Sequence, residues 1–372
     1  MSQILVSLIS EQTIQNLLLM KKWPDVDRHI FISTELMENR QKSAWLIQAA
    51  GLPPEKVDVV TIEEDSLDDI EHELRRLKFD DDDHFLVNAT GGTKIMSISV
   101  YLFFSHKSSE IFYINIAKNS YRKIFPEVKR KENELDVRLG LQEYLTTYGI
   151  EITNIDKINK LIKPATYTPQ FYSFFNRLTD FDQKIINDLR LWRNRKKRSL
   201  PIDQMDGLAT FLDRAQFPLD DPGVLSKHEI DYITGAWFEE YIYTVIKEFL
   251  KLKESEIGTG VSILLDNVEN ELDILFTYRH ALYIIECKTG IFDSSAGRNI
   301  LNDTLYKQYS LGSDFGLRVK PYIFTTIEKG ELKYQVRQSE IDRAEHFRIK
   351  IVDGTALRDP RQRLDVLKGI KG

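Results

Sequence analysis

The first 115 residues alternate between short apolar runs and longer amphipathic stretches, and this alternation restricts the possible folds most. Runs with the length and composition of strands occur at residues 4–9, 29–33, 57–60, 85–88 and 111–115. The stretches between them have helical spacing, at residues 13–22, 37–50, 67–77 and 95–104. Because consecutive parallel strands are joined by crossover helices, this order predicts an α/β fold with a mostly parallel sheet and helices on both faces.

Two polar loops follow strands of this predicted sheet. In such sheets ligands bind beyond the carboxyl ends of the strands, so we expect both loops to face one crevice. The loop after the first strand contains Ser10, Glu11, Gln12 and Thr13. Taken alone, such a segment is more often a helix cap than a binding loop, because Ser and Thr commonly precede helices.

The second loop follows the fourth strand and is rich in glycine. Glycines let the backbone approach a ligand, hydroxyls and free N–H groups donate hydrogen bonds, and a lysine supplies a positive charge. The pattern favours a phosphate ligand, although a purely structural turn remains an alternative. It matches neither the Walker loop nor the dinucleotide fingerprint. The loop residues are Thr90, Gly91, Gly92, Thr93 and Lys94.

A second group of charged residues interrupts apolar strands near the C-terminal third, where a break at residues 277–280 separates two strand-like runs. Asp273 lies on the first run, and Glu286 and Lys288 share one face of the second. Asp273 and Glu286 are candidate ligands of a hard divalent cation, with the backbone carbonyl of Cys287 as a third, while Lys288 orients the attacking water. The alternative is a surface hairpin with cross-strand ion pairs.

Helices flank this predicted hairpin. On the helix that begins near residue 231, Glu239 lies on the apolar face, whereas Glu240 shares a face with Thr244 and Lys247. We therefore expect Glu239 to be a further acid near the metal, with a buried ion pair as the alternative. A later helix over residues 299–309 carries Tyr306, Lys307 and Gln308, which either orient ligands or form a solvated face, and residues 322–325 follow as another strand.

The length of 372 residues predicts more than one domain. We place a domain with the two polar loops at residues 1–148, a linker region with helices at 149–225 and a domain with the acids and the lysine at 226–372. A net charge of −6 argues against a protein that coats nucleic acid by bulk positive charge. The linker region has a basic cluster that either lines a nucleic-acid channel or is a solvated helix face: Arg193, Arg195, Lys196, Lys197 and Arg198.

The apolar runs are all too short to span a membrane, and the first residues lack the basic segment and cleavage site of a signal peptide. We therefore expect a cytoplasmic protein without a membrane partner. The single cysteine excludes internal disulfides.

Two families resemble the two halves of the chain. Asp273 with Glu286, Cys287 and Lys288 resembles the core of PD-(D/E)xK nucleases, with residues 233–241 as their opening helix, although the proline of the family motif is absent. Residues 7–13 and 88–96 resemble the ligand loops of CARF domains, the Rossmann-like sensors of type III CRISPR systems. Together they resemble CRISPR ancillary nucleases that join one domain of each kind.

This resemblance implies a homodimer that binds cyclic tetra-adenylate across paired CARF domains and thereby activates two nuclease domains in antiviral defence. It also implies dependence on Mn²⁺ or Mg²⁺ and cleavage of single-stranded RNA, single-stranded DNA or nicking of supercoiled DNA. Two alternatives stay open. One is a regulator that binds cyclic oligoadenylate without nuclease activity, and the other is a ring nuclease in which Thr90, Thr93 or Lys94 positions the reacting phosphate.

Overall fold

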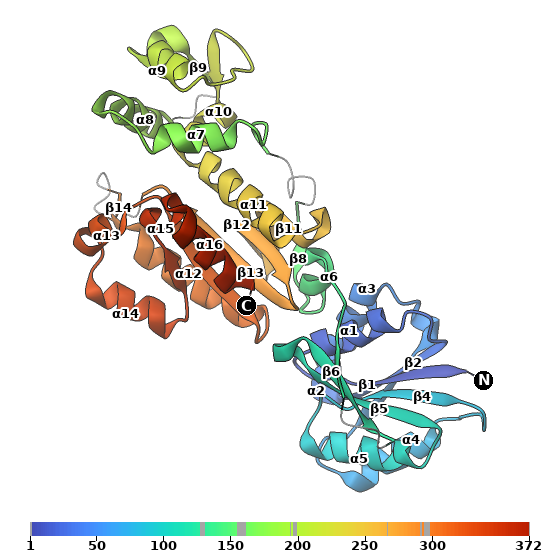
Figure 1. The fold of residues 1–372 in the computed structure, drawn as a ribbon. Coiled ribbons are helices and arrows are strands. Elements are labelled where there is room, and N and C mark those ends of the chain that lie inside the picture. The colour runs from blue at the N-terminus through green and yellow to red at the C-terminus, as the bar shows by residue number, and fades with distance from the viewer. Residues whose placement is uncertain are drawn as a thin grey trace.

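The computed structural model describes residues 2–126, 131–154, 161–193, 195, 199–265, 267–290, 292–293 and 298–371. Two large sheets, each with its own helices, lie one beyond the other, and a group of helices lies at the far end of the second sheet (Figure 1). In the described part of the chain no helix is long and apolar enough to cross a membrane.

The N-terminal sheet has the order β3-β2-β1-β4-β5-β6-β7. Its first five members pair in parallel, which confirms the predicted mostly parallel sheet, and the last two add an antiparallel edge. The strands are β1 (Gln3–Leu8), β2 (Arg28–Thr34), β3 (Val57–Ile62), β4 (His84–Asn88), β5 (Ser109–Asn115), β6 (Ser120–Phe125) and β7 (Glu132–Glu134).

Helices cover both faces of this sheet. Alternate residues of each strand point to opposite faces, and they pack into two different apolar clusters that each include helices. Leu5 and Phe31 pack with α1 (Ile14–Lys22) and α3 (Lys42–Ala50). Val6 and Ile32 pack with α4 (Leu67–Arg76) and α5 (Lys94–Ser105).

The single helix predicted over residues 37–50 is wrong in one respect. It is divided into α2 (Glu35–Asn39) and α3, and Gln41 between them has a φ of 56°. A residue with left-handed backbone angles cannot continue an α-helix. The apolar residues on either side keep their helical spacing, so the sequence does not reveal this break.

The C-terminal sheet has the order β17-β16-β13-β12-β11-β8, with β11, β12 and β13 antiparallel and β13, β16 and β17 parallel. The predicted hairpin is present. Strand β12 extends to Tyr278, and a tight turn follows at Arg279 and His280, both of which have positive φ. The strands are β8 (Glu151–Ile152), β11 (Ile257–Leu265), β12 (Val268–Tyr278), β13 (Ala281–Lys288), β16 (Val319–Thr325) and β17 (Lys350–Val352), with a small separate pair β14 (Phe292–Asp293) and β15 (Arg298–Asn299).

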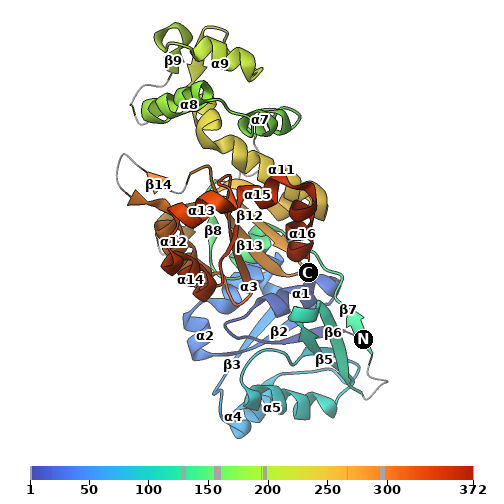
Figure 2. The same ribbon diagram turned by 60° about the vertical axis from the view of Figure 1, so that its left-hand side comes forward.

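This sheet is also covered on both faces. One face packs against α11 (Trp237–Leu250), α15 (Gly354–Arg358) and α16 (Pro360–Lys371), and the other against α12 (Ile300–Asp314). Helix α14 (Gln338–His346) packs beside α12, and α13 (Lys329–Gln335) lies near the carboxyl ends of the strands (Figure 2).

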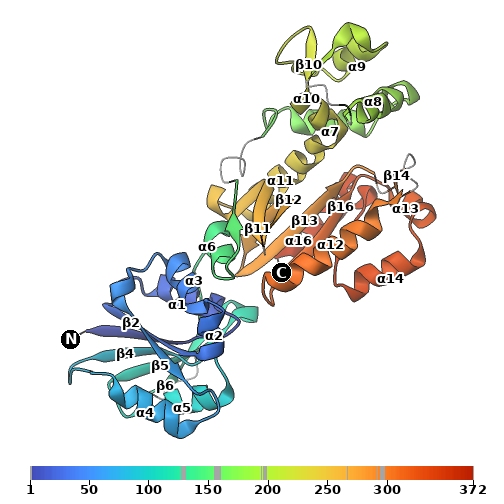
Figure 3. The ribbon, with the colours of Figure 1, turned by 180° about the vertical axis from the view of Figure 1, so that it is seen from behind.

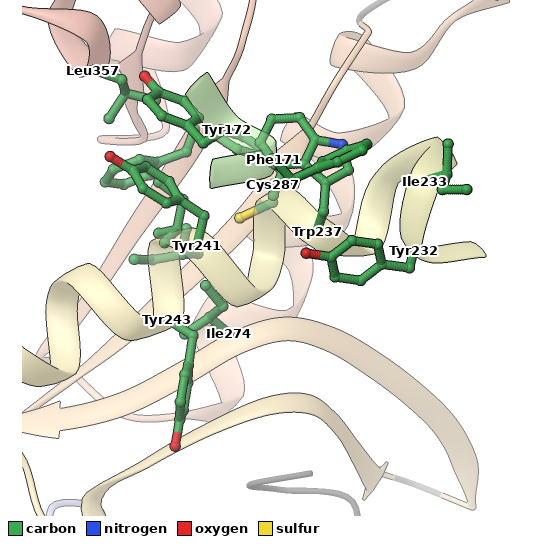
Figure 4. Packing of buried hydrophobic residues seen from close by; sticks show 14 of the residues in the cluster. Phe171, Tyr172, Tyr232, Ile233, Trp237, Tyr241, Tyr243, Ile274, Cys287 and Leu357 are labelled. Carbon is green, nitrogen blue, oxygen red and sulfur yellow. The ribbon is translucent and has the colours of Figure 1, made fainter. Parts of the chain in front are cut away.

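The segment before α11 forms a helical group whose aromatic side chains share one cluster with the C-terminal domain. In Figure 4 the rings of Phe171, Tyr172 and Tyr232 surround Trp237 and Tyr241, and those of Tyr172 and Tyr241 stack with centroids 4.0 Å apart. Aromatic packing of this kind anchors the group rigidly to α11. Its elements are α7 (Thr168–Phe175), α8 (Asp180–Arg193), β9 (Ser199–Pro201), α9 (Leu208–Arg214), β10 (Val224–Ser226) and α10 (Lys227–Asp231).

The two sheet domains meet through a shared apolar cluster, seen from behind in Figure 3. Tyr144 of α6 (Leu141–Thr146) is fully buried there and donates to the Phe315 carbonyl, 3.2 Å away. His280 on the β12–β13 turn lies 2.8 Å from the Val137 carbonyl through its Nε2. The segment that follows β7 thus contacts the second domain directly.

His280 makes the junction sensitive to acid. Its side chain is 3 % exposed, and burial with the nearby Arg318 lowers its pKa from 6.5 to about 4. In the unfolded chain this histidine is protonated below about pH 6.5, whereas in the folded chain it stays neutral down to about pH 4. The free energy of unfolding therefore falls as the pH is lowered through this range, by roughly 3 kcal/mol at most. We expect His280→Asn to flatten the pH dependence of urea unfolding between pH 7 and 5. His72→Asn, at an exposed histidine, should leave it unchanged, and equal slopes for both variants would contradict this role.

Candidate functional site

The hairpin brings two carboxylates and a lysine together on adjacent strands. Ile274 pairs with Ile285 in the antiparallel register, so Asp273 lies opposite Glu286. The Lys288 ammonium lies 3.2 Å from Asp273 Oδ2 and 2.8 Å from Glu286 Oε2. Asp273 Oδ2 also accepts a 2.7 Å hydrogen bond from the Cys287 backbone N–H. One cation, the Lys288 ammonium, therefore bridges the buried Glu286 and the partly buried Asp273, which would otherwise repel each other.

Burial and the neighbouring charges shift the pKa values of the two acids in opposite directions. Burial, and then the charge of Glu286, raises the pKa of Asp273 from 3.8 to about 6. Burial also opposes ionisation of Glu286, but Lys288 and Lys307 outweigh it and lower the pKa of that carboxyl. Lys288 is held protonated, since the two acids outweigh its own burial and raise its pKa. The site is a crowded anionic cluster that lysines only partly neutralise.

Of the three candidates on α12, one reaches the acids. Lys307 Nζ lies 3.0 Å from Glu286 Oε1 and 2.7 Å from the Glu271 carbonyl oxygen. Gln308 is buried and donates to the Tyr322 carbonyl, while Tyr306 is half exposed under the Arg343 guanidinium. Lys307 thus forms the second lysine of the cluster, and its spacing on the helix alone did not distinguish it from its neighbours.

Glu239 comes to the cluster from α11. It is partly buried, and burial followed by the charge of Asp273 raises its pKa well above the ordinary value. Among the charged groups that act on Glu239, Asp273 has the largest effect, which indicates that α11 turns this carboxyl toward the acids.

The expectation for Glu240 was incomplete. Its side chain is 3 % exposed, accepts a hydrogen bond from the Ile162 backbone N–H and lies 3.4 Å from the Thr168 hydroxyl. Burial raises its pKa to about 7. Helix spacing assigned it to a polar face with Thr244 and Lys247, but α7 covers that face, which the local sequence of α11 does not reveal.

The donor set suits a hard divalent cation. The two carboxylates repel each other, and burial together with this repulsion raises the pKa of Asp273, so a bound cation would stabilise the pair in its charged form. Their oxygen atoms are also the ligands that Mg²⁺ and Mn²⁺ prefer. The Cys287 side chain is buried in the apolar cluster with Trp237 (Figure 4), which leaves only its backbone to face the acids. In the described residues, a group of three acids with carboxylate oxygens close enough together for one ion is formed by Asp80, Asp82 and Asp83, on a loop of the N-terminal domain. That loop has no lysine or strand register organising it, so we base no site on it.

The glycine-rich loop lies directly beside the end of β1. A side chain at Gly91 would place its Cβ 2.7 Å from the Leu8 carbonyl oxygen, and Gly92 has a φ of 74°. Behind the loop, Asn88 donates to Asn16, which in turn donates to the Leu8 carbonyl. These buried amides fix the two loops together, as expected from their positions after neighbouring strands.

Not every residue of the two loops is free to bind. Thr93 caps α5 and donates to the Glu64 carbonyl, and Thr90 accepts from the Ile114 N–H. Thr13 is fully buried and donates to the Thr147 carbonyl. Lys94, at the first turn of α5, is exposed and has no ion pair with any residue that the structure describes. An exposed cation at a helix N-terminus is suited to an anionic ligand.

The remaining residues of the first loop make contacts of their own. Ser10 is partly buried, and Glu11 pairs with Arg40 and Lys42. Gln12 points to the other domain: its Oε1 accepts from the Tyr148 hydroxyl at 3.1 Å and from the Leu317 backbone N–H at 3.2 Å. Residue 12 thus joins the candidate ligand site to the loop that follows α12, the helix that carries Lys307.

Comparison with known protein families finds a match in each of two parts of the chain. Residues 4–144 match the Card1 CARF domain, and residues 226–367 match the Card1-like endonuclease domain. Among curated proteins, no match was found.

Solved structures share the fold. Can2 from Sulfobacillus thermosulfidooxidans, in complex with cyclic tetra-adenylate, is 21 % identical with a TM-score of 0.73 over 98 % of this chain and 99 % of that one. Protein VC1899 from Vibrio cholerae is 19 % identical with a TM-score of 0.76 over 99 % and 98 %. A type III CRISPR defence DNA nuclease activated by cyclic oligoadenylate is 15 % identical with a TM-score of 0.55 over 88 % of this chain and 45 % of that one.

Proposed function

This chain belongs to the nucleases that combine a Card1 CARF domain with a Card1-like endonuclease domain, and we propose that it is a metal-dependent endonuclease activated by cyclic tetra-adenylate. We propose further that it acts in the cytoplasm as a homodimer in type III CRISPR defence. Residues 1–148 would sense the ligand and residues 226–372 would cut, with the helices of residues 149–225 packed against the catalytic part.

One observation carries the catalytic half of this proposal. Asp273 and Glu286 face each other on adjacent strands with Lys288 between them, inside the domain that matches the endonuclease family. A divalent cation held there would polarise the scissile phosphate and lower the pKa of a bound water. Asp273, Glu286 and the Cys287 carbonyl would supply its ligands, with Glu239 as an additional acid.

The lysines have separate parts in the proposed reaction. Lys288 is held protonated between the acids, so it can orient the attacking water and stabilise negative charge on the phosphate. Lys307 holds Glu286 in place from α12. If Glu286 were a ligand of a divalent cation, Lys307 would be available to the phosphate of the substrate.

The ligand half of the proposal rests on the two loops. Lys94, the backbone around Gly91 and Gly92, and the polar residues Ser10, Glu11 and Gln12 would surround a cyclic oligoadenylate. The side chains of Thr13, Thr90 and Thr93 would maintain the two loops. Gln12 supplies a direct link to the catalytic domain, because a ligand that moves this loop also moves the acceptor of the Leu317 N–H. For activation, the ligand must bind the active arrangement more tightly than the inactive one.

The homodimer proposal is supported by an apolar face on α5. Ile98 and Leu102, one helical turn apart, are 51 % and 53 % exposed, and the same helix begins at Lys94. A second copy packed here would bring two ligand loops close to one axis. We expect Ile98→Glu with Leu102→Glu to give monomers in light scattering and to weaken binding of cyclic tetra-adenylate by roughly tenfold or more.

Leu364→Glu is the matched control for this prediction, because Leu364 is a similarly exposed leucine on α16 of the other domain. It should remain dimeric. A dimer that persists in the α5 variant would remove this face from the interface.

The direct test of the proposed function is cleavage of labelled single-stranded RNA, single-stranded DNA and supercoiled plasmid with Mn²⁺ or Mg²⁺, each with and without cyclic tetra-adenylate. Cleavage that requires both metal and ligand would support the proposal and identify the substrate. Binding of the ligand without cleavage would favour the non-catalytic regulator. Slow conversion of the ligand to linear products by a Glu286→Gln variant would instead locate ring cleavage in the first domain.

A further inference from the structure

Helix α8 carries a guanidinium that the proposed chemistry does not use. Arg190 is partly buried, and its Nη2 lies 3.3 Å from the Thr289 hydroxyl. Thr289 directly follows Lys288, so this guanidinium lies beside the carboxyl end of the catalytic strand β13. Both ribbon views place α8 beyond that end of the sheet, near α13 (Figures 1 and 2). The helix belongs to a segment outside both family matches.

Within the described ranges, Arg190 forms no ion pair with an acid that would neutralise it. Its remaining hydrogen bond goes to the Asn187 side-chain oxygen at 3.2 Å. Burial and the charge of Arg193 lower the pKa of Arg190, so the charge that acts on it most strongly is a like charge. Arg193 itself is only loosely paired with Asp231, at 3.8 Å. Two neighbouring guanidinium groups whose charges are so little neutralised by acids favour the binding of an anion.

The space in front of Arg190 is large enough for a nucleotide. A pocket of about 400 Å³ extends from Thr289 and Thr326, at the ends of β13 and β16, to α8. Its other charged side chains are Arg358, which pairs with Glu328, and the exposed Glu331. The Arg190 guanidinium is therefore the cation of this pocket that lies nearest the catalytic strand and is left for an incoming anion.

We propose that Arg190, with Arg193 beside it, binds a backbone phosphate of the single-stranded nucleic-acid substrate next to the scissile bond, and that α8 thereby forms one wall of the substrate cleft. This proposal rests on the endonuclease function proposed above. A guanidinium matches a phosphate in two parallel hydrogen bonds, which gives register as well as affinity. The side chain acts on substrate position, while the acids and Lys288 act on the reaction.

Arg190→Gln tests the proposal in the full-length protein saturated with cyclic tetra-adenylate. We expect the KM for a labelled single-stranded oligonucleotide to rise about tenfold, with kcat changed less than about twofold. Anisotropy titrations of the same oligonucleotide with Ca²⁺ in place of Mn²⁺ should show a similar loss of affinity, and the slope of log Kd against log salt should fall by about one. Lys184→Gln removes an equal charge from the exposed side of the same helix and should change neither quantity.

Arg190→Lys separates binding from a structural role. If Arg190 binds phosphate, lysine should restore the salt slope but only part of the affinity, because the two-pronged geometry is lost. Equal oligonucleotide affinities of the Arg190→Gln and Lys184→Gln variants would overturn the proposal. It would also be overturned if Arg190→Lys had wild-type affinity while Arg190→Gln lowered the unfolding temperature, because Arg190 would then have a structural role. A wild-type protein that binds the oligonucleotide without cutting it contradicts the endonuclease proposal alone, and the ratio of affinities still decides the phosphate site. If the wild-type protein binds no oligonucleotide, the proposed phosphate site is overturned.

Discussion

Glu286→Gln is expected to reduce ligand-activated cleavage on the order of a thousandfold while leaving the protein folded. The substitution preserves shape but removes a negative charge that a divalent cation needs, opposite Asp273 in the strand register. The two lysines that contact Glu286 lose an ion pair, so some stability is lost, but the Gln amide oxygen can still accept hydrogen bonds from them. Lys288 also keeps its contact with Asp273, and we therefore expect the protein to remain folded. The measurement is the cleavage rate at saturating Mn²⁺ and cyclic tetra-adenylate, together with the thermal unfolding midpoint.

Glu269→Gln is the control for this experiment. Glu269 lies on the same hairpin, is exposed and contacts the Thr153 hydroxyl, so its loss should leave the rate unchanged. Retention of metal-dependent cleavage by Glu286→Gln would remove Glu286 from the catalytic site. Asp273→Asn should behave as Glu286→Gln does, because the two carboxylates would share the proposed cation.

Gly91→Val is expected to raise the concentration of cyclic tetra-adenylate needed for half activation by roughly a hundredfold. The new Cβ would meet the Leu8 carbonyl oxygen at 2.7 Å, and the Gln15 amide and Ser10 hydroxyl lie at 3.2 and 3.3 Å. Leu8 ends a central strand and cannot move away, so the loop must shift and carry the start of α5 and Lys94 with it. The measurement is the dependence of cleavage on ligand concentration, with direct ligand binding by calorimetry.

A glycine in open space provides the comparison. A Cβ added at Gly330, near the start of α13, would meet no described atom within 4 Å, so Gly330→Ala should activate normally. Normal activation of Gly91→Val would show that close approach of the two loops is not needed for sensing.

Much of the fold was predictable because the signals that define it are local. A strand shows its buried face with a period of two and a helix with a period of 3.6, so the alternation before residue 115 predicted the parallel sheet of the first domain. The hairpin followed from the same rule, and with it the common face of Glu286 and Lys288. The break at Gln41 escaped prediction, since one left-handed residue does not disturb the apolar spacing around it.

The candidate site was predictable only in part. Acids and a lysine within apolar strands stand out in a sequence, because burying a charge is costly without a partner. The identity of the partner is a different matter. Lys307 resembled its neighbours on α12, Glu240 had the spacing of a polar helix face, and Arg190 lay in a stretch without a motif; each acquired its environment from a segment far away in the chain.

The sequence by itself therefore determined the α/β architecture, the two families and the residues whose charge demands an explanation. Only the tertiary structure decided which of those charges meet. Packing placed Gln12 of the candidate ligand loop on the Leu317 N–H and set α8 against the end of β13. The physical reason is that backbone periodicity is a property of a few consecutive residues, whereas neutralisation of a buried charge depends on contacts between segments that the chain brings together only when it folds.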